Sequence, residues 1–475
     1  MVFSSTFFLF SFLPAIILCY YAQRLLSPTG LRNAVLLLFS YFFYLYGAAG
    51  FLLILLMSTF VDYLLGLLID RVNRHKKLWL CFSVIFNLGL LIYFKYVNFF
   101  VAELNCALVF LRYFPIEWKE IIFPIGISFF TFKKLSYIID VYRGQSPAMA
   151  NIVDFALYIA FFPQLIAGPI VRYSYFRNQL TDRRESWNNF FDGILRFCWG
   201  LAKKVMIANS CGQIADVIFN LNVELLDTKV AWLGAIAYTL QIYFDFSAYS
   251  DMAIGLGMLF GFKTPENFRR PYSAVSVTDF WRRWHITLSQ WFRDYLYIPL
   301  GGNRRGLPRT CFNMAVVCIL CGFWHGANWT FLIWGIYHAF FLILERVTGA
   351  RRLPAEKFGA LRRFITLFIV TVGWVIFRSE DISQAMGFLA TMFTSSDLSL
   401  SYELIRALNY RNILFLVTAL TVFFLPGDFF GIKMLIEKKE PVALVAGILL
   451  ILLLFPYCAT MIAGGGSSSF IYYRF

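Results

Sequence analysis

Two of the four histidines in this 475-residue chain, His285 and His325, stand in tryptophan-rich segments and could take part in proton transfer. His325 lies within the apolar run Cys318–Phe340, where an ionisable side chain at membrane depth costs roughly 2.5–3.5 kcal/mol. An apolar environment keeps histidine neutral and able to accept a hydroxyl proton, and a positioned general base contributes about 10²–10⁴-fold. A histidine in this state could act as a general base toward a hydroxyl group, which is the main requirement for transfer of an acyl group to that hydroxyl. A neutral histidine bonded to a backbone carbonyl is the structural alternative.

The residues beside His325 favour a functional role for this histidine over a structural one. Gly326 and Ala327 would let a ligand or another backbone approach closely. The amide of the following asparagine can orient a ring nitrogen. The residues expected to line the site around the two histidines are Trp281, Trp284, Trp324 and Asn328.

Several other kinds of site are excluded. The sequence has no Gly-rich phosphate loop, no H-E-x-x-H and no G-x-S-x-G. His325 and His338 would lie about 220° apart if both were on one helix, so they would not share a metal, and His338 is expected to be structural. Asp245 and Asp251 would lie about 240° apart, which predicts helix–helix hydrogen bonds rather than a carboxylate pair. We expect no metal and no bound cofactor.

The composition is that of an integral membrane protein. Hydrophobic residues make up 60% of the chain and charged residues 15%, whereas soluble domains are about 25% charged. The net charge of +15 falls in short loops between apolar runs, which indicates positive-inside topology rather than nucleic-acid binding. Cys318 and Cys321 lie in a membrane segment without a second pair, so we expect buried apolar side chains there.

The pattern of apolar runs predicts an all-α membrane protein with about eleven membrane segments. Ala34–Ile69 is too long for one span and should break at Gly47–Gly50. A further break is expected in Phe155–Ile170, at Pro163, Gly168 and Pro169, where a cavity or protein must satisfy the backbone. Thr278–Leu296 is expected to be one amphipathic, interfacial helix. We expect residues 1–475 to form one domain, with 464–475 as an extracytoplasmic tail.

Several segments resemble the membrane-bound O-acyltransferase (MBOAT) family, in particular its bacterial alginate O-acetyltransferase branch. They include GFWHGANWT, FPQLIAGPIVR, YFDFSAYSDMAIGLG, NFRRPY and FWRRWHITLSQWFRDYLYIPLGGNRRG. The resemblance implies helices around a central tunnel, with His325 as the central catalytic histidine and His285 as the second. Lys133 and Lys134 depart from the pattern, because a glutamine is expected after FFTF.

The resemblance also implies a reaction. Acetyl groups would pass from a cytoplasmic thioester donor, acetyl-CoA, to an extracytoplasmic polysaccharide of the alginate type, completed by a separate SGNH-type protein. The enzyme would be multi-pass in the bacterial cytoplasmic membrane, in contact with lipid. Peptidoglycan O-acetylation and teichoic acid D-alanylation are alternatives within the family. A lipid-linked sugar transporter is an alternative of another class, although no inverted repeat supports it.

Basic residues on either side of the His285 segment are candidates for recruiting a negatively charged donor. Ordinary positive-inside anchoring explains them equally well. The candidates are Arg269, Arg270, Arg304 and Arg305.

The last six residues, Phe470–Phe475, follow a Gly/Ser linker and are rich in aromatic side chains. Free termini are usually disordered, but a free aromatic-rich tail would expose an apolar patch to water. Such a tail is therefore expected to lie in a groove of its own protein. It resembles a C-terminal F-x-Y-x-x-F motif of polymer acyl transfer, in which Tyr472 would carry the acyl group. Tyr473 would point the other way in an extended chain, and a packing anchor is the alternative.

Overall fold

The computed structural model describes residues 1–26, 29–72, 74–223, 226–350, 354, 358–394, 401–424, 441–465 and 470–471. These residues form helices, turns and loops and contain no strand, which confirms the all-α prediction. They fall into two compact units. Unit 1 comprises Met1–Phe3, Phe7–Glu185 and Gly261–Lys263, and unit 2 comprises Ser4–Thr6, Ser186–Phe260 and Thr264–Phe475. One domain over 1–475 stays a prediction.

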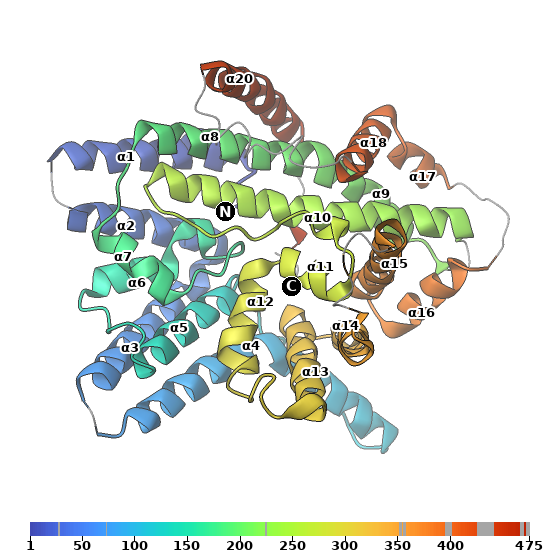
Figure 1. Cartoon of the computed structure of the whole chain (residues 1–475), viewed down its shortest axis with the longest axis horizontal. Helices are drawn as coiled ribbons and strands as arrows, with labels where there is room; N and C mark the ends of the chain where they lie inside the picture. Colours follow the sequence, from blue (N-terminus) through green and yellow to red (C-terminus); the bar gives the residue numbers. More distant parts are fainter. Residues whose placement is uncertain are drawn as a thin grey trace. The chain divides into compact units, whose positions relative to one another are not determined.

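Unit 1 contains the first seven α-helices (Figure 1). The expected break in the long apolar run is present, because a 3₁₀ turn over Ala49–Phe51 separates its two helices. The expected break at Pro163 is also present, in a 3₁₀ turn over Phe162–Gln164. The helices are α1 (Leu13–Leu26), α2 (Thr29–Ala48), α3 (Leu52–Arg71), α4 (Lys76–Phe110), α5 (Ile127–Tyr142), α6 (Ile152–Ala160) and α7 (Tyr173–Thr181).

Two buried lysines of α5 are satisfied by the protein itself. Lys133 Nζ donates to the carbonyls of Tyr158, at 3.2 Å, and Ile159, at 3.5 Å, in the last turn of α6, where the helix dipole favours a cation. Lys134 Nζ donates to Ser58 Oγ of α3. The departure from the family pattern at these positions therefore has a structural explanation within unit 1.

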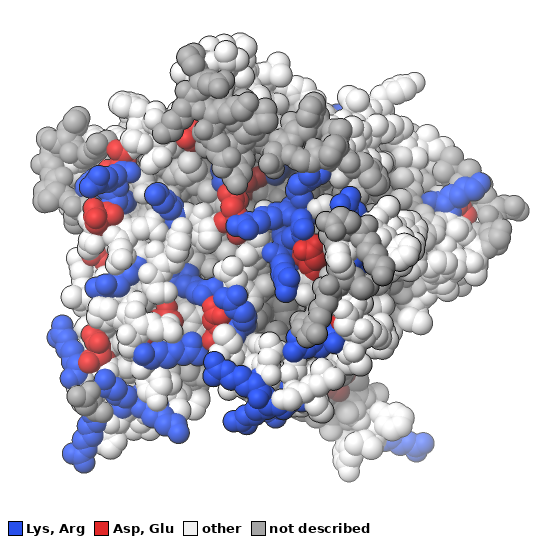
Figure 2. Space-filling view, viewed as in Figure 1, with Lys and Arg blue, Asp and Glu red and all other residues white. Residues whose placement is uncertain are grey.

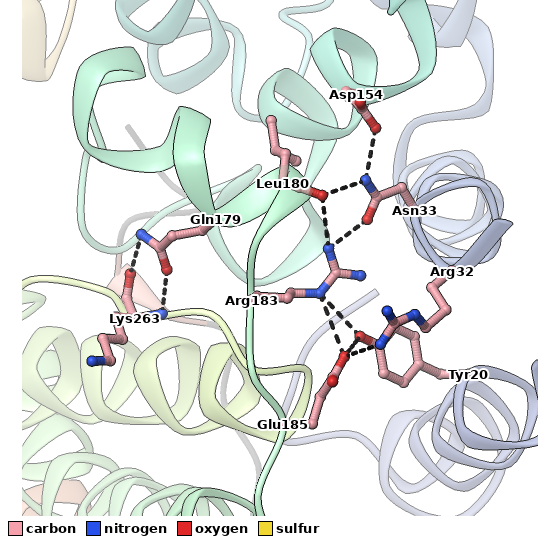
Figure 3. A network of polar contacts seen from close by, with 9 residues as sticks. All are labelled: Tyr20, Arg32, Asn33, Asp154, Gln179, Leu180, Arg183, Glu185 and Lys263. Atoms are coloured by element: carbon pink, nitrogen blue, oxygen red, sulfur yellow. Dashed lines mark hydrogen bonds and ion pairs between the residues drawn. The ribbon is translucent and has the colours of Figure 1, made fainter. Parts of the chain in front are cut away.

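A buried polar network ties α1, α2 and α7 together (Figure 3). Arg183, from the basic loop after α7, donates from Nε to Tyr20 Oη at 3.0 Å and from Nη1 to Asn33 Oδ1 at 2.6 Å. The Glu185 carboxylate accepts hydrogen bonds from Tyr20 and from Arg32, each at 2.6 Å. Each of these contacts joins residues far apart in the sequence, so the network fixes the packing of unit 1.

Replacing Arg183 with leucine is expected to destabilise the protein. The change leaves Glu185 buried with one cation fewer, and breaking a buried charge network costs about 3–5 kcal/mol. Thermal unfolding in detergent measures the effect. The control is Arg184→Leu, because Arg184 is exposed and its loss should leave the unfolding midpoint almost unchanged. Equal midpoints for the two variants would contradict a stabilising role for the network.

Unit 2 is built around α10, a long helix that is buried along most of its length and lies beside α8 (Figure 1). Glycines permit this close approach, since a Cβ on Gly255 would lie 2.6 Å from the carbonyl oxygen of Gly193. The helices are α8 (Trp187–Ala202), α9 (Asn209–Phe219), α10 (Thr228–Leu259), α11 (Val277–Arg283), α12 (Ile286–Phe292), α13 (Gly306–His325), α14 (Trp329–Thr348), α15 (Gly359–Arg378), α16 (Ile382–Thr391), α17 (Tyr402–Ala407), α18 (Tyr410–Phe424) and α20 (Pro441–Ala463).

The prediction of one helix over Thr278–Leu296 is wrong. The chain breaks between α11 and α12 at His285, whose backbone is left-handed with φ 41°. The break is fixed by a distant residue: Asn267 accepts from the Ile286 amide through its carbonyl oxygen and from the Thr287 amide through its side chain. The first amides of α12 are thereby satisfied without a continuous helix.

The protein is a multi-pass membrane protein. Six helical stretches of the described chain are long and apolar enough to cross a membrane: Leu31–Arg71, Lys76–Phe110, Gly306–His325, Trp329–Thr348, Gly359–Arg378 and Val442–Ala463. Two shorter apolar helices are Phe8–Gln23 and Tyr410–Phe423. The first stretch contains both α2 and α3. The count of about eleven segments stays a prediction.

Candidate active site

His325 is the last residue of α13, at the turn of a helical hairpin with α14. The hairpin packs tightly because Gly322 has no side chain: a Cβ there would lie 2.3 Å from the carbonyl oxygen of Phe331. Asn328 caps α14 by accepting from the Thr330 amide at 3.0 Å. The turn therefore holds the His325 ring, 5% exposed, against the helix that returns beside it.

The hairpin also changes where His338 lies relative to His325, compared with the prediction from one helix. The 220° separation assumed one helix, whereas His325 and His338 lie on two helices joined by a tight turn. Both rings pack against Trp334, with centroids 5.3 and 4.9 Å away. His338 is 1% exposed, and its two ring nitrogens have no hydrogen-bond partner among the described residues. The structure thus adds His338 to the cluster around His325.

His285 is held by the side chain of Asn267. Its Nδ1 lies 3.1 Å from Asn267 Oδ1, which also accepts from Thr287 Oγ1 at 2.8 Å. An amide oxygen can only accept, so this contact assigns the proton to Nδ1 and the lone pair to Nε2. Burial lowers the pKa of His285 to about 3, so the ring is neutral at physiological pH.

Trp324 lies between the two histidines predicted to be catalytic. Its ring centroid is 6.4 Å from that of His285 and 4.9 Å from that of His325. Residues forty positions apart in the sequence are therefore brought to one indole.

The other predicted lining residues contact partners other than the His325 ring. Trp281 packs against His338 at 5.1 Å, and Trp284 packs against Trp374 at 4.9 Å. Asn328 uses both polar atoms on the backbone, because its Nδ2 donates to the carbonyl of Glu380 at 2.7 Å while its Oδ1 caps α14. In this structure it fixes the hairpin turn instead of orienting a ring nitrogen.

A cavity of about 190 Å³ is separated from His325 by the side chain of Phe377. Phe377 lines this cavity, and its ring packs against the His325 ring at 5.2 Å. A water molecule takes up about 30 Å³, so the cavity has room for an acetyl group. Its lining residues are Asp216, Tyr238, Gln241, Asn328, Phe331, Phe377, Arg378, Ser379, Glu380 and Ile471.

The end of the chain reaches this cavity. Phe470 is buried, with its ring 5.1 Å from that of Tyr249 in an edge-to-face arrangement. Ile471 is 8% exposed and lines the cavity. Tyr472 and Tyr473 lie outside the described residues. The expectation that the tail lies in a groove of its own protein is met at Phe470 and Ile471.

The four arginines proposed for donor binding lie in two loops of unit 2. Arg269, Arg304 and Arg305 are exposed and Arg270 is half-buried. Figure 2 shows Lys and Arg side chains spread over the face in view, with Asp and Glu interspersed among them. The exposed guanidinium groups can contact an anionic ligand, and their role stays a prediction. No group of three or more metal-ligating side chains gathers within the described ranges.

The structure adds residues that the sequence did not single out: Asn267, Trp334 and Phe377. The expectation for the two aspartates of α10 is confirmed, because both bind side chains from the neighbouring helical segment. Asp245 pairs with Lys204 at 2.6 Å, and Asp251 pairs with Lys203 at 2.6 Å and Arg196 at 2.9 Å. The lysines belong to a π-helical turn, Lys203–Ala208, a feature frequent at functional sites.

Comparison with known proteins gives a family match and three similar relatives. The family described as MBOAT, membrane-bound O-acyltransferase, matches residues 145–378, which include both His285 and His325. The chain is 44% identical over 444 residues to the probable alginate O-acetylase AlgI of Pseudomonas syringae pv. tomato, over 93% of this chain and 83% of the relative. It is 36% identical to a peptidoglycan O-acetyltransferase of Helicobacter pylori, over 87% and 83% of the two chains.

A third relative is more distant. Teichoic acid D-alanyltransferase of Bacillus subtilis is 28% identical over 281 residues, which cover 54% of this chain and 69% of the relative.

Proposed function

Because the chain belongs to the membrane-bound O-acyltransferase family and is an O-acyltransferase, we propose that it O-acetylates an extracytoplasmic polysaccharide of the alginate type. The donor is acetyl-CoA on the cytoplasmic side, and the enzyme resides in the bacterial cytoplasmic membrane. An SGNH-type protein outside completes transfer to the polymer. The observation that carries this proposal is the 44% identity to an alginate O-acetylase over 93% of the chain.

In this reaction His325 acts as the general base. It takes the proton of the attacking hydroxyl, the hydroxyl oxygen bonds to the acetyl carbonyl carbon, the carbon–sulfur bond breaks, and the proton passes to the departing thiol. The aromatic side chains of Trp324, Trp334 and Phe377 support this role, because they pack around the His325 ring and hold it in place. His285 serves as the second active-site histidine, oriented by Asn267.

The first acceptor is the Tyr472 hydroxyl, which holds the acetyl group as a phenyl ester. A phenol has a pKa of about 10 and is a better leaving group than a sugar alcohol, so onward transfer is favourable. The position of Ile471 at the cavity supports this step, since Tyr472 is the next residue in the sequence. This proposal puts the tail, 464–475, on the extracytoplasmic side, as predicted from the order of apolar segments and basic loops in the sequence.

A gene-deletion strain tests the choice of polymer. Loss of ester-linked acetyl groups from the secreted polysaccharide, with peptidoglycan acetylation unchanged, is the expected result. Loss from peptidoglycan instead would favour the second candidate, which the Helicobacter pylori relative supports.

Replacing the four candidate arginines should weaken donor binding. We expect Arg269→Gln with Arg270→Gln, and Arg304→Gln with Arg305→Gln, to raise the apparent KM for acetyl-CoA. The rise should be larger at low salt, because salt screens exposed charges. Initial rates at two ionic strengths measure the effect. An unchanged KM in normally inserted protein would assign these residues to membrane anchoring.

Asn267 is expected to act through His285. Asn267→Leu removes the acceptor that fixes the ring and should lower acetylation about 10-fold or more, as loss of an orienting partner does elsewhere. Asn267→Asp keeps an acceptor oxygen and should retain more activity. Acetyl transfer by membranes with matched protein levels provides the measurement. Equal activity in wild type and Asn267→Leu would remove Asn267 from the site.

A further inference from the structure

The carboxylate of Asp245 joins an ion pair to the end of the chain. Its Oδ1 accepts from Lys204 Nζ at 2.6 Å, and its Oδ2 accepts from the backbone N–H of Ile471 at 2.7 Å. Lys204 Nζ also lies 4.5 Å from the centroid of the Phe470 ring, within the range of a cation–π contact. One buried pair thus contacts two consecutive tail residues that lie 226 and 225 positions beyond Asp245.

Because the ion pair is buried, the loss of one of its hydrogen-bond partners would destabilise it. The Lys204 and Asp245 side chains are each 2% exposed. A buried ion pair recovers its desolvation cost only when its remaining lone pairs and protons also find partners. The amide of Ile471 supplies such a partner for the second carboxylate oxygen. Departure of the tail would therefore remove a hydrogen bond from a buried charge.

A neighbouring ion pair from the same helices makes a useful comparison. Lys203 pairs with Asp251, and these side chains are 18% and 14% exposed. Asp251 shares Arg196 with Glu266, so that cluster is completed by side chains of the helical core and the following loop. The Lys204–Asp245 pair is completed by the tail instead.

The tail contacts also lead toward the cavity. Ile471 lines the same cavity as Phe377, whose ring packs against His325. The amide that binds Asp245 and the side chain that lines the cavity belong to one residue. The contact that holds the Ile471 amide therefore also holds Ile471 at the cavity wall.

We propose that the buried Lys204–Asp245 pair is a docking site for the C-terminal tail of its own chain. It recognises the Phe470 ring and the Ile471 amide, and it holds Ile471 at the wall of the cavity near His325. Lys204 and Asp245 are positioning residues in this account. The positioning half rests on the proposed function, whereas the docking half does not.

Amide hydrogen exchange of the C-terminal peptide, followed by mass spectrometry, tests the docking without substrate. The variant combines Lys204→Met with Asp245→Leu, because replacing a buried ion pair by apolar residues of similar size commonly preserves the fold. The matched control combines Lys203→Met with Asp251→Leu and leaves Arg196 paired with Glu266. Exchange in α8 and α10 reports whether each variant is folded.

We expect exchange at Ile471 to be at least about tenfold faster in the Lys204/Asp245 variant than in wild type, as for a site that opens locally. The control should retain the wild-type rate at Ile471. Equal rates at Ile471 in all three proteins would overturn the docking site. Because no acetyl donor is present, this result is independent of whether the proposed acetyl transfer is correct.

Tail variants test the positioning without touching the helical core. Ile471→Pro deletes the N–H donor, whereas Ile471→Ala keeps it and shortens only the side chain. We expect Ile471→Pro to lose most polymer acetylation and Ile471→Ala to retain most of it. Equal acetylation by Ile471→Pro and wild type would overturn the positioning role. Transfer by wild type is measured in parallel, and its absence would reject the proposed function instead.

Discussion

Replacing His325 with glutamine is expected to abolish polymer acetylation while the protein remains folded and inserted. Glutamine keeps a polar side chain of similar length against Trp324 and Trp334 but cannot take a proton from a hydroxyl group. The loss should approach the factor of about 10²–10⁴ that a general base contributes. Acetyl ester content of the polymer, normalised to protein in the membrane, is the measurement.

The matched control for this change is His338→Gln. His338 packs against the same Trp334 ring and is equally inaccessible, so a general disturbance of the aromatic cluster would affect both variants alike. We expect His338→Gln to retain most activity and His285→Ala to lose a large part of it. Retention of more than about a tenth of wild-type acetylation by His325→Gln would reject the general base. If His285 proves dispensable and His338 essential, then His338 is the second active-site histidine and His285 is structural.

The second large effect is expected from Tyr472→Phe. The substitution keeps the aromatic ring that a packing anchor would need and removes only the hydroxyl that forms the acetyl ester. Acetylation of the polymer should therefore fall to background, with the tail still docked through Phe470 and Ile471. Polymer acetylation in cells that carry the variant gives the result.

Tyr473→Phe is the control for this substitution, because it makes the same chemical change one residue later. In an extended chain adjacent side chains point in opposite directions, so Tyr473→Phe should retain activity. Full activity of Tyr472→Phe would leave the tail as an anchor. Loss in Tyr473→Phe alone would move the acyl group to Tyr473.

Features set by local composition could be predicted from the sequence. The break between α2 and α3 follows from the length of an apolar run and its glycines. The turn at Phe162–Gln164 follows from a proline at depth. The membrane character follows from the scarcity of charge. The importance of His325 is predicted from its burial cost, its small neighbours and the family resemblance. The structure adds that the His325 and His285 rings both pack against Trp324.

Features set by distant partners could not be predicted in the same way. The helix break at His285 depends on Asn267, eighteen positions earlier, which satisfies the first amides of α12. His338 joins the cluster because Gly322 lets α13 and α14 pack closely, and the helical angle between two histidines carries no information about a hairpin. The link from Asp245 to Ile471 spans almost half the chain. Periodicity describes one element at a time and cannot supply such pairings.

The most direct test of the catalytic role of His325 uses purified protein in lipid vesicles, with acetyl-CoA carrying an isotopically labelled acetyl group as the sole substrate. Mass spectrometry then reads the peptide that contains Tyr472. We predict a labelled acetyl ester on this peptide in wild type and none in His325→Gln or Tyr472→Phe. Equal labelling of wild type and His325→Gln, or a wild-type peptide that carries no label, would contradict transfer from the thioester to the tail by His325.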